Sequence, residues 1–129
     1  MPVVKDEKDL IVLRQYACSG NKKFFLGTDS APHDIIYKKE KNNTKPGIFT
    51  SPVALELYLS IFDEEEKIEN FEKFSSKNGS NFYNLPINDN KITLEKNDWI
   101  NSEFTKYNNI QIKNFMGGKK IKWKIKDNI

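Results

Sequence analysis

An apolar run without alternation, at residues 23–27 (Lys-Phe-Phe-Leu-Gly), most constrains what this 129-residue chain can fold into. A strand that lacks a polar face is covered on both sides, as the strands of parallel sheets are. Helical spacing precedes it at 6–19 and resumes after Ser51, so helix, buried strand, loop and helix follow one another. Residues 2–4 (Pro-Val-Val) resemble the end of another strand, and two strands cannot form a parallel sheet with both faces buried. The chain is therefore expected to be the final portion of a larger α/β domain.

The ends of the predicted helices carry residues that favour helix termini. Acidic side chains in the first turn and Gly20 after the last turn delimit the helix at 6–19. Ser51 as N-cap and Pro52 at the first helical position open the second helix. A third helix, beginning at residue 65 or 66, is expected to end near the Asn-Gly pair at 78–79, with one further helical turn at 80–83 as an open alternative.

Period-two alternation predicts short strands in the last third of the chain, at 91–95, 110–112 and 121–125. Residues 101–109 form the least regular part, and 34–50 are expected to form a long loop. The lysines of the last strand alternate with apolar residues. This pattern is more typical of the solvated face of an edge strand than of a nucleic-acid patch.

The composition excludes several classes of protein. Cys18 is the only cysteine and His33 the only histidine, which excludes a disulfide scaffold, a zinc ribbon and a His-rich metal site built by this chain alone. No apolar run approaches the roughly 20 residues of a membrane span, and the first residues lack the pattern of a secretory signal. The net charge of +3 is weak evidence for a nucleic-acid partner. No membrane or nucleic-acid partner is expected, and the predicted location is cytoplasmic.

Asp29 and His33, in the polar loop after the predicted strand, are the candidate functional residues. In open α/β sheets and barrels, ligands bind at the carboxyl ends of the strands. A carboxylate there can act as a metal ligand or general base, although an aspartate after a strand is also a common turn former or helix cap. His33 is a candidate for binding a substrate carboxylate or a metal, or for capping a turn. Cys18, Trp99 and Trp123 are expected to be packing residues.

The loop and four further segments resemble one family. Residues 25–33 (Phe-Leu-Gly-Thr-Asp-Ser-Ala-Pro-His) resemble the last barrel strand and loop of the dihydroorotases, in the amidohydrolase superfamily. The other segments are similar to that family's preceding helix end, last barrel helix, Asn-Gly…Leu-Pro segment and terminus: 17–24, 49–58, 78–88 and 115–123. The similarity covers nearly the whole chain and is specific to the shorter, homodimeric bacterial type.

The resemblance implies a zinc-dependent cyclic amide hydrolase of de novo pyrimidine biosynthesis, which cyclises N-carbamoyl-L-aspartate to L-dihydroorotate at a binuclear zinc site. The residue matching Asp29 ligates one zinc and takes the proton of the bridging hydroxide, which fits the ability of zinc to lower the pKa of bound water. The residue matching His33 binds the substrate carboxylate. The residue matching Pro46 contacts the substrate through its backbone, and because proline lacks an N–H, Gly47 is the alternative donor.

The same resemblance implies a division of the chain. Residues 1–84 are expected to form the C-terminal portion of a TIM (β/α)8 barrel, and residues 85–129 a β extension. The family's other metal ligands and its substrate-binding Arg and Asn have no counterpart here, so the chain is expected to be inactive alone. Its expected partners are the small-molecule substrate and a second copy, as in the homodimeric family, or an upstream barrel fragment. The alternative is a non-catalytic interaction module, or a complementing fragment of a split barrel.

Overall fold

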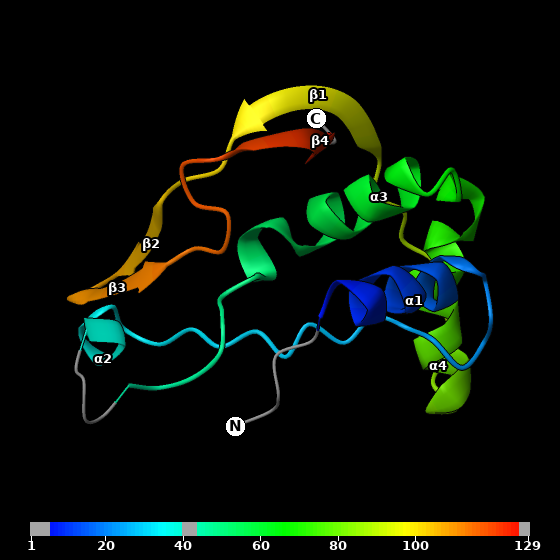
Figure 1. Cartoon of the computed structure of the whole chain (residues 1–129), viewed down its shortest axis with the longest axis horizontal. Coiled ribbons are helices and arrows are strands. Elements are labelled where there is room, and N and C mark those ends of the chain that lie inside the picture. Colours follow the sequence, from blue (N-terminus) through cyan, green and yellow to red (C-terminus); the bar gives the residue numbers. More distant parts are fainter. Residues whose placement is uncertain (1–5, 40–43, 127–129) are drawn as a thin grey trace.

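The computed structural model describes residues 6–39 and 44–126 and places helices before two small antiparallel sheets (Figure 1). Helix α3 lies between the β1–β4 sheet and α1, while the β2–β3 hairpin lies beside α2. The elements are α1 (Glu7–Cys18), α2 (Ile36–Lys39), η1 (Ser51–Val53), α3 (Ala54–Glu64), η2 (Ile68–Asn70), η3 (Lys73–Lys77), α4 (Asn78–Phe82), β1 (Leu94–Ile100), β2 (Phe104–Tyr107), β3 (Ile110–Lys113) and β4 (Lys120–Ile125).

Helix α1 begins and ends where the sequence predicts. The backbone N–H of Asp9 donates to Asp6 Oδ1 at 2.9 Å, and the Asp9 side chain accepts a hydrogen bond from the Asp6 N–H at 3.4 Å. This reciprocal capping box satisfies N–H groups that the first helical turn leaves unpaired. Gly20 follows the helix with a φ of +76°, which a residue without Cβ adopts easily. The predicted helix is confirmed.

Residues 23–27 do not form a strand within the described structure, so that prediction is wrong. A strand needs a neighbour to supply hydrogen-bond partners. Here the backbone N–H of Leu26 donates instead to the carbonyl of Phe74, at 2.9 Å. Phe24 and Phe25 pack against aromatic rings of α1 and α4, respectively. Helices therefore cover part of the apolar run, and its three hydrophobic side chains remain half-buried.

The predicted N-cap role of Ser51 is also wrong. Thr50 holds the N-cap position of η1, and its side chain makes no capping hydrogen bond within the described residues. The backbone N–H groups of Thr50 and Ser51 donate instead to Ser30 Oγ, at 3.0 and 3.1 Å. A hydroxyl twenty residues away in sequence therefore does what the local pattern assigns to Ser51. Pro52 occupies the early helical position predicted for it.

A broken helical path follows α3 in place of the continuous third helix that was predicted. It passes through η2 and the π-helical turn η3, then continues through α4. Asn78 does not end it, because its side-chain amide donates to the carbonyls of Asn21 and Phe24, at 3.3 and 2.9 Å. A Cβ on Gly79 would lie 3.3 Å from the Phe25 ring. The pair predicted as a C-cap instead packs against the segment before the polar loop.

The last third of the chain is antiparallel, as its alternation predicts. Strand β1 pairs with β4 and has an irregularity between Lys96 and Trp99, and β2 pairs with β3. The strands predicted at 110–112 and 121–125 are confirmed. The strand predicted at 91–95 begins only at its fourth residue and extends further.

Two predictions about irregular segments are wrong. Strand β2 lies inside 101–109, where the buried Asn114 side chain accepts a hydrogen bond from the Thr105 hydroxyl at 2.8 Å. Helix α2 lies inside the long loop predicted at 34–50. The strand end predicted at 2–4 lies outside the described residues.

The core is formed by α1, α3 and the helical path that follows α3. Phe62 is 1% exposed, and its ring centroid lies 5.3 Å from those of Phe71 and Phe74. Burial of each such side chain contributes about 1.5–3 kcal/mol. Cys18 belongs to the same cluster, and burial raises the pKa of its thiol, as expected for a packing residue. Trp123 packs against this cluster.

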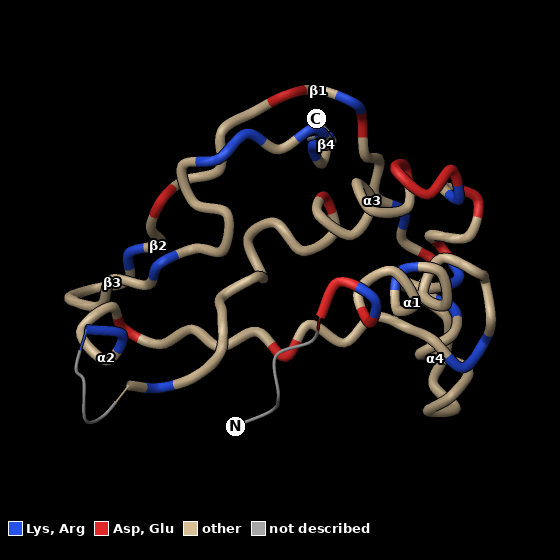
Figure 2. The backbone as a smooth tube through the Cα atoms, viewed as in Figure 1, with Lys and Arg blue, Asp and Glu red and all other residues tan. Residues whose placement is uncertain are grey.

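Acidic residues at the C-terminal end of α3 pair with basic side chains of α1, β1 and β4 (Figure 2). Arg14 pairs with Glu64 and Glu65 at 2.7 and 2.8 Å, and Lys96 pairs with Asp63 at 2.7 Å. Lys122 of β4 lies 3.9 Å from Glu64. The three lysines of β4, at 120, 122 and 124, are exposed, so this strand presents the predicted solvated face. None of the helices among the described residues is long and apolar enough to cross a membrane.

Candidate functional site

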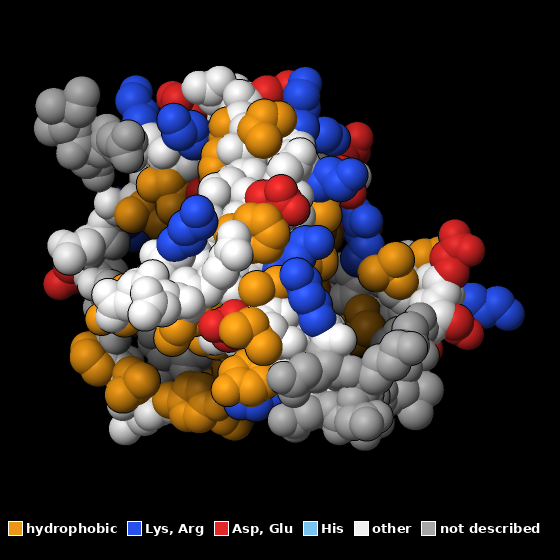
Figure 3. Space-filling model, turned by 90° about the vertical axis from the view of Figure 1, so that its left-hand side faces the viewer, with side chains coloured by type: hydrophobic (Ala, Val, Ile, Leu, Met, Phe, Trp, Pro, Cys, Tyr) orange, Lys and Arg blue, Asp and Glu red, His pale blue; other side chains and the backbone are white. Residues whose placement is uncertain are grey.

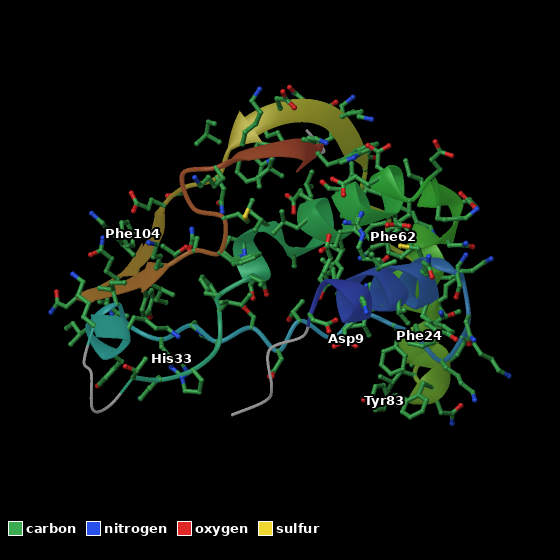
Figure 4. All side chains as sticks on the ribbon, in the orientation of Figure 1. Asp9, Phe24, His33, Phe62, Tyr83 and Phe104 are labelled. Atoms are coloured by element: carbon green, nitrogen blue, oxygen red, sulfur yellow. The ribbon has the colours of Figure 1, made fainter. Side chains whose placement is uncertain are left out.

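The polar loop at 28–33 and the chain at 44–50 are joined by a backbone–backbone hydrogen bond and by bonds to the Ser30 hydroxyl. The N–H of Ala31 donates to the carbonyl of Ile48 at 2.9 Å. Further along, Ser30 Oγ accepts the two N–H groups at the start of η1. Figure 4 shows the His33 side chain reaching toward the second segment. The two segments therefore form one surface, although ten residues, 34–43, lie between them in the sequence.

Asp29 lies at the start of this surface with an unusual backbone conformation. Its φ is +42°, in the left-handed region that residues with a Cβ rarely occupy. Its side chain is exposed, whereas its neighbours Thr28 and Ser30 are half-buried. The loop therefore directs a carboxylate outward from a constrained backbone position, and such a carboxylate is available to a ligand or to another polypeptide.

His33 and Gly47 line a common pocket of about 450 Å³, within the range of about 300–1,000 Å³ typical of small-molecule sites. The end of β3 and the turn that follows it complete the wall with Lys113, Phe115 and Lys119. Figure 3 shows this side of the molecule, where hydrophobic side chains reach the surface among lysines. The structure thus brings together two of the four residues that the sequence singled out.

The other two candidates, Asp29 and Pro46, are not among the residues that line this pocket. Pro46 is exposed and lies directly before Gly47. Asp29 lies on the same loop as His33 but is exposed outside the cavity. A site that uses both Asp29 and His33 must therefore extend beyond the pocket to the exposed Asp29 side chain.

Lys38 holds the second segment in place, a role that sequence reasoning did not identify. Its Nζ donates to the carbonyls of Lys45 and Gly47, at 2.7 and 2.6 Å. Gly47 has a φ of +96°, and a Cβ there would lie 2.6 Å from the Ala31 Cβ. A larger residue at 47 would push the two segments apart. The Pro-Gly turn is visible in the sequence, but no local pattern reveals the lysine that supports it.

The described residues do not form a zinc site by themselves. They contain no group of three or more His, Cys, Asp or Glu side chains placed to hold a metal ion. Protein zinc sites use three or four such ligands. Asp29 would supply one carboxylate, so the remaining ligands of any zinc ion here would have to come from elsewhere.

Comparison with known proteins gives a consistent result, although no family model matches the chain. The chain is 44% identical over 126 residues to the dihydroorotase of Erythrobacter litoralis and 40% identical to that of Aliivibrio salmonicida. Each alignment covers 98% of this chain and 36% of the relative. The chain thus spans about a third of the length of the curated relatives it matches.

Solved structures give the same match. The dihydroorotase of Saccharomyces cerevisiae, solved with 5-fluoroorotic acid, superposes with a TM-score of 0.89 at 29% identity, over 97% of this chain and 36% of that one. The Campylobacter jejuni dihydroorotase superposes with a TM-score of 0.82 at 31% identity, over 98% and 36%. The resemblance and the α/β fold class inferred from the sequence are confirmed. In sequence and in fold, the chain matches the C-terminal part of dihydroorotase.

Proposed function

We propose that this chain supplies the C-terminal part of a dihydroorotase, which interconverts N-carbamoyl-L-aspartate and L-dihydroorotate in pyrimidine biosynthesis. The observation that carries the proposal is the superposition of 97% of the chain on a solved dihydroorotase with a TM-score of 0.89. A cytoplasmic location follows from the same proposal. Residues 1–84 would belong to the barrel and 85–129 to the β extension, which packs on α3 through β4.

The proposed roles of the site residues follow from their positions. Asp29 presents an exposed carboxylate from a constrained backbone, which suits a proton acceptor and metal ligand. His33 lines the pocket and would bind the substrate carboxylate. Gly47, held by Lys38 beside His33, would offer the backbone contact that Pro46 cannot donate. Zinc belongs to this proposal only with ligands from outside the described residues.

The exposed apolar surface of helix α1 supports the proposal that a further polypeptide packs against this chain. Its side chains at 10–13 and Tyr16 are apolar, and each is about half exposed. An apolar helix surface of this kind is normally buried against another element. We propose that the missing barrel covers it and contributes the other metal ligands. The same observation favours the second candidate, a complementing fragment of a split barrel without activity of its own.

A hybrid enzyme tests the proposal. The matching C-terminal segment of the Erythrobacter litoralis dihydroorotase is replaced by this chain, and hydrolysis of dihydroorotate is measured. The hybrid is expected to turn over substrate, whereas its Asp29→Asn form folds but is inactive. The His33→Ala form is expected mainly to raise KM.

Asp98→Asn is the matched control, because the Asp98 side chain lies in an exposed ion pair with Lys120 at 2.9 Å. A folded hybrid without turnover would overturn the proposed function. Normal kinetics in the Asp29→Asn hybrid would overturn the proposed roles while leaving the family match intact.

A further inference from the structure

We infer that Ser30 is a positioning residue that holds Asp29 in its outward conformation by anchoring the polar loop to the start of η1 and α3. The inference rests on the proposed function for its catalytic consequence, but its structural part stands on the geometry alone. Ser30 is the residue directly after Asp29. Its Oγ accepts two backbone hydrogen bonds, from Thr50 at 3.0 Å and Ser51 at 3.1 Å.

The start of the η1–α3 helix depends on this hydroxyl. The first N–H groups of a helix have no partners within the helix and need an external acceptor. Thr50, the residue at the N-cap position, does not supply it within the described structure, and its Oγ1 is buried without a hydrogen-bond partner there. Ser30 thus acts as the cap from a distant part of the chain, so the loop and the helix start are held together as one unit.

The conformation of Asp29 explains why such an anchor is needed. A φ of +42° is unfavourable for an L-residue with a side chain and persists only where the surroundings enforce it. On one side Asp29 follows Gly27-Thr28, and on the other it is joined to the anchored Ser30. Without the Ser30 hydroxyl, the nearest hydrogen bond that the described residues still offer is that from the Ala31 N–H to the Ile48 carbonyl, two residues away. Asp29 would then relax toward an extended φ and its carboxylate would move.

Two different sets of hydrogen bonds hold the two parts of the proposed site. The Ser30 bonds fix the side that carries Asp29, whereas the Ala31–Ile48 bond and Lys38 fix the pocket that contains His33 and Gly47. Loss of the Ser30 hydroxyl is therefore expected to affect the step that uses Asp29 more than the binding of substrate. A displacement of about 1 Å in a reacting group can lower a rate by roughly a hundredfold.

The structural test uses the 129-residue chain and NMR. In Ser30→Ala, amide exchange at Thr50 and Ser51 should accelerate, and the backbone scalar coupling of Asp29 should rise toward that of an extended residue. Ser30→Thr, which keeps the hydroxyl, should restore both. Ser60→Ala is the matched control, because it removes a hydroxyl that donates to the Glu56 carbonyl within α3 and is remote from Asp29. An unchanged Asp29 coupling in a folded Ser30→Ala chain would overturn the inference.

The kinetic test uses the hybrid enzyme. Ser30→Ala should lower kcat roughly ten- to a hundredfold with little change in KM, and Ser30→Thr should recover most of the loss. An equal loss in Ser60→Ala, or a rise in KM alone, would contradict the positioning role. If the unsubstituted hybrid is inactive, the proposed function fails, whereas the NMR comparison still decides whether Ser30 fixes Asp29.

Discussion

Helices α1 and α3 lie side by side but differ in how much of their apolar surface the chain covers. Helix α3 packs under β4 and buries Leu59 and Phe62 at 4% and 1% exposure. Helix α1 leaves Leu10 and Leu13 at 53% and 51% exposure and buries only Cys18. Strand β4 thus covers part of α3, whereas α1 has a surface suited to contact with more protein. The region around α3 is nearly self-sufficient, whereas α1 keeps an exposed apolar surface.

The largest expected effect is a loss of stability when the core around α3 is disrupted. Phe62→Ala should destabilise the chain by about 3–5 kcal/mol, because it opens a cavity beside Phe71 and Phe74. Leu13→Ala is the matched change on α1 and should cost less than about 0.5 kcal/mol in the chain alone. Denaturant unfolding followed by circular dichroism measures both. Similar losses for the two variants would contradict the difference between the helices.

The buried carboxyl of Glu56 tests how completely the region around α3 excludes water. It is 5% exposed on α3, and burial raises the pKa of its carboxyl above the usual 4.5. A raised pKa in the folded state gives a stability contribution that is complete below the unfolded value and is lost as the pH rises through the folded value. Glu56→Gln should therefore gain stability relative to the wild type as the pH rises from 4 to 7, by on the order of 1 kcal/mol. Parallel stability curves would show that the carboxyl is solvated after folding.

The exposed apolar surface of α1 gives the opposite prediction, in which binding changes and the stability of the chain does not. Replacing Leu10 and Leu13 by serine should hardly change the unfolding of the chain alone, because both side chains are already half exposed. The same double variant should bind less tightly to a dihydroorotase polypeptide that lacks the matching segment. Calorimetric titration measures the difference. Unchanged affinity would mean that α1 is not the covered surface.

The smallest expected effect concerns an exposed ion-pair cluster. Lys77 and Lys91 contact Glu72 at 2.6 and 2.7 Å and lower the pKa of its carboxyl to about 2. Lys91→Met should raise that pKa toward 4.5, as followed by NMR titration. Stability should change little, because exposed ion pairs are weak and screened by salt. A large fall in stability would contradict this expectation, because it would mean that the ion pairs hold the segment around Lys91 in its folded position.

The sequence predicted the elements whose signals are local. The Asp6 capping box and the alternation at 121–125 are complete within a few residues, and both α1 and β4 formed as expected. The family motifs identified the relatives. His33 and Gly47 both line one pocket, and the roles that the sequence assigns to them stay predictions.

The failures share a physical cause, which is that distant residues override local patterns. Ser51 has a good N-cap sequence, yet Ser30 provides the acceptor. Asn78-Gly79 has a good C-cap sequence, yet Asn78 is used to hold the carbonyls of Asn21 and Phe24. The apolar run at 23–27 has the composition of a strand, but a strand requires neighbours that the described residues do not supply.

The most direct test of the central claim is a titration of this chain into the Erythrobacter litoralis dihydroorotase that lacks its matching C-terminal segment, with zinc present. Formation of N-carbamoyl-L-aspartate from dihydroorotate should appear only in the mixture and saturate at an equimolar ratio. The Asp29→Asn chain should bind equally well without restoring turnover. A stable complex of the wild-type chain without turnover, or full turnover by the chain alone, would contradict the account.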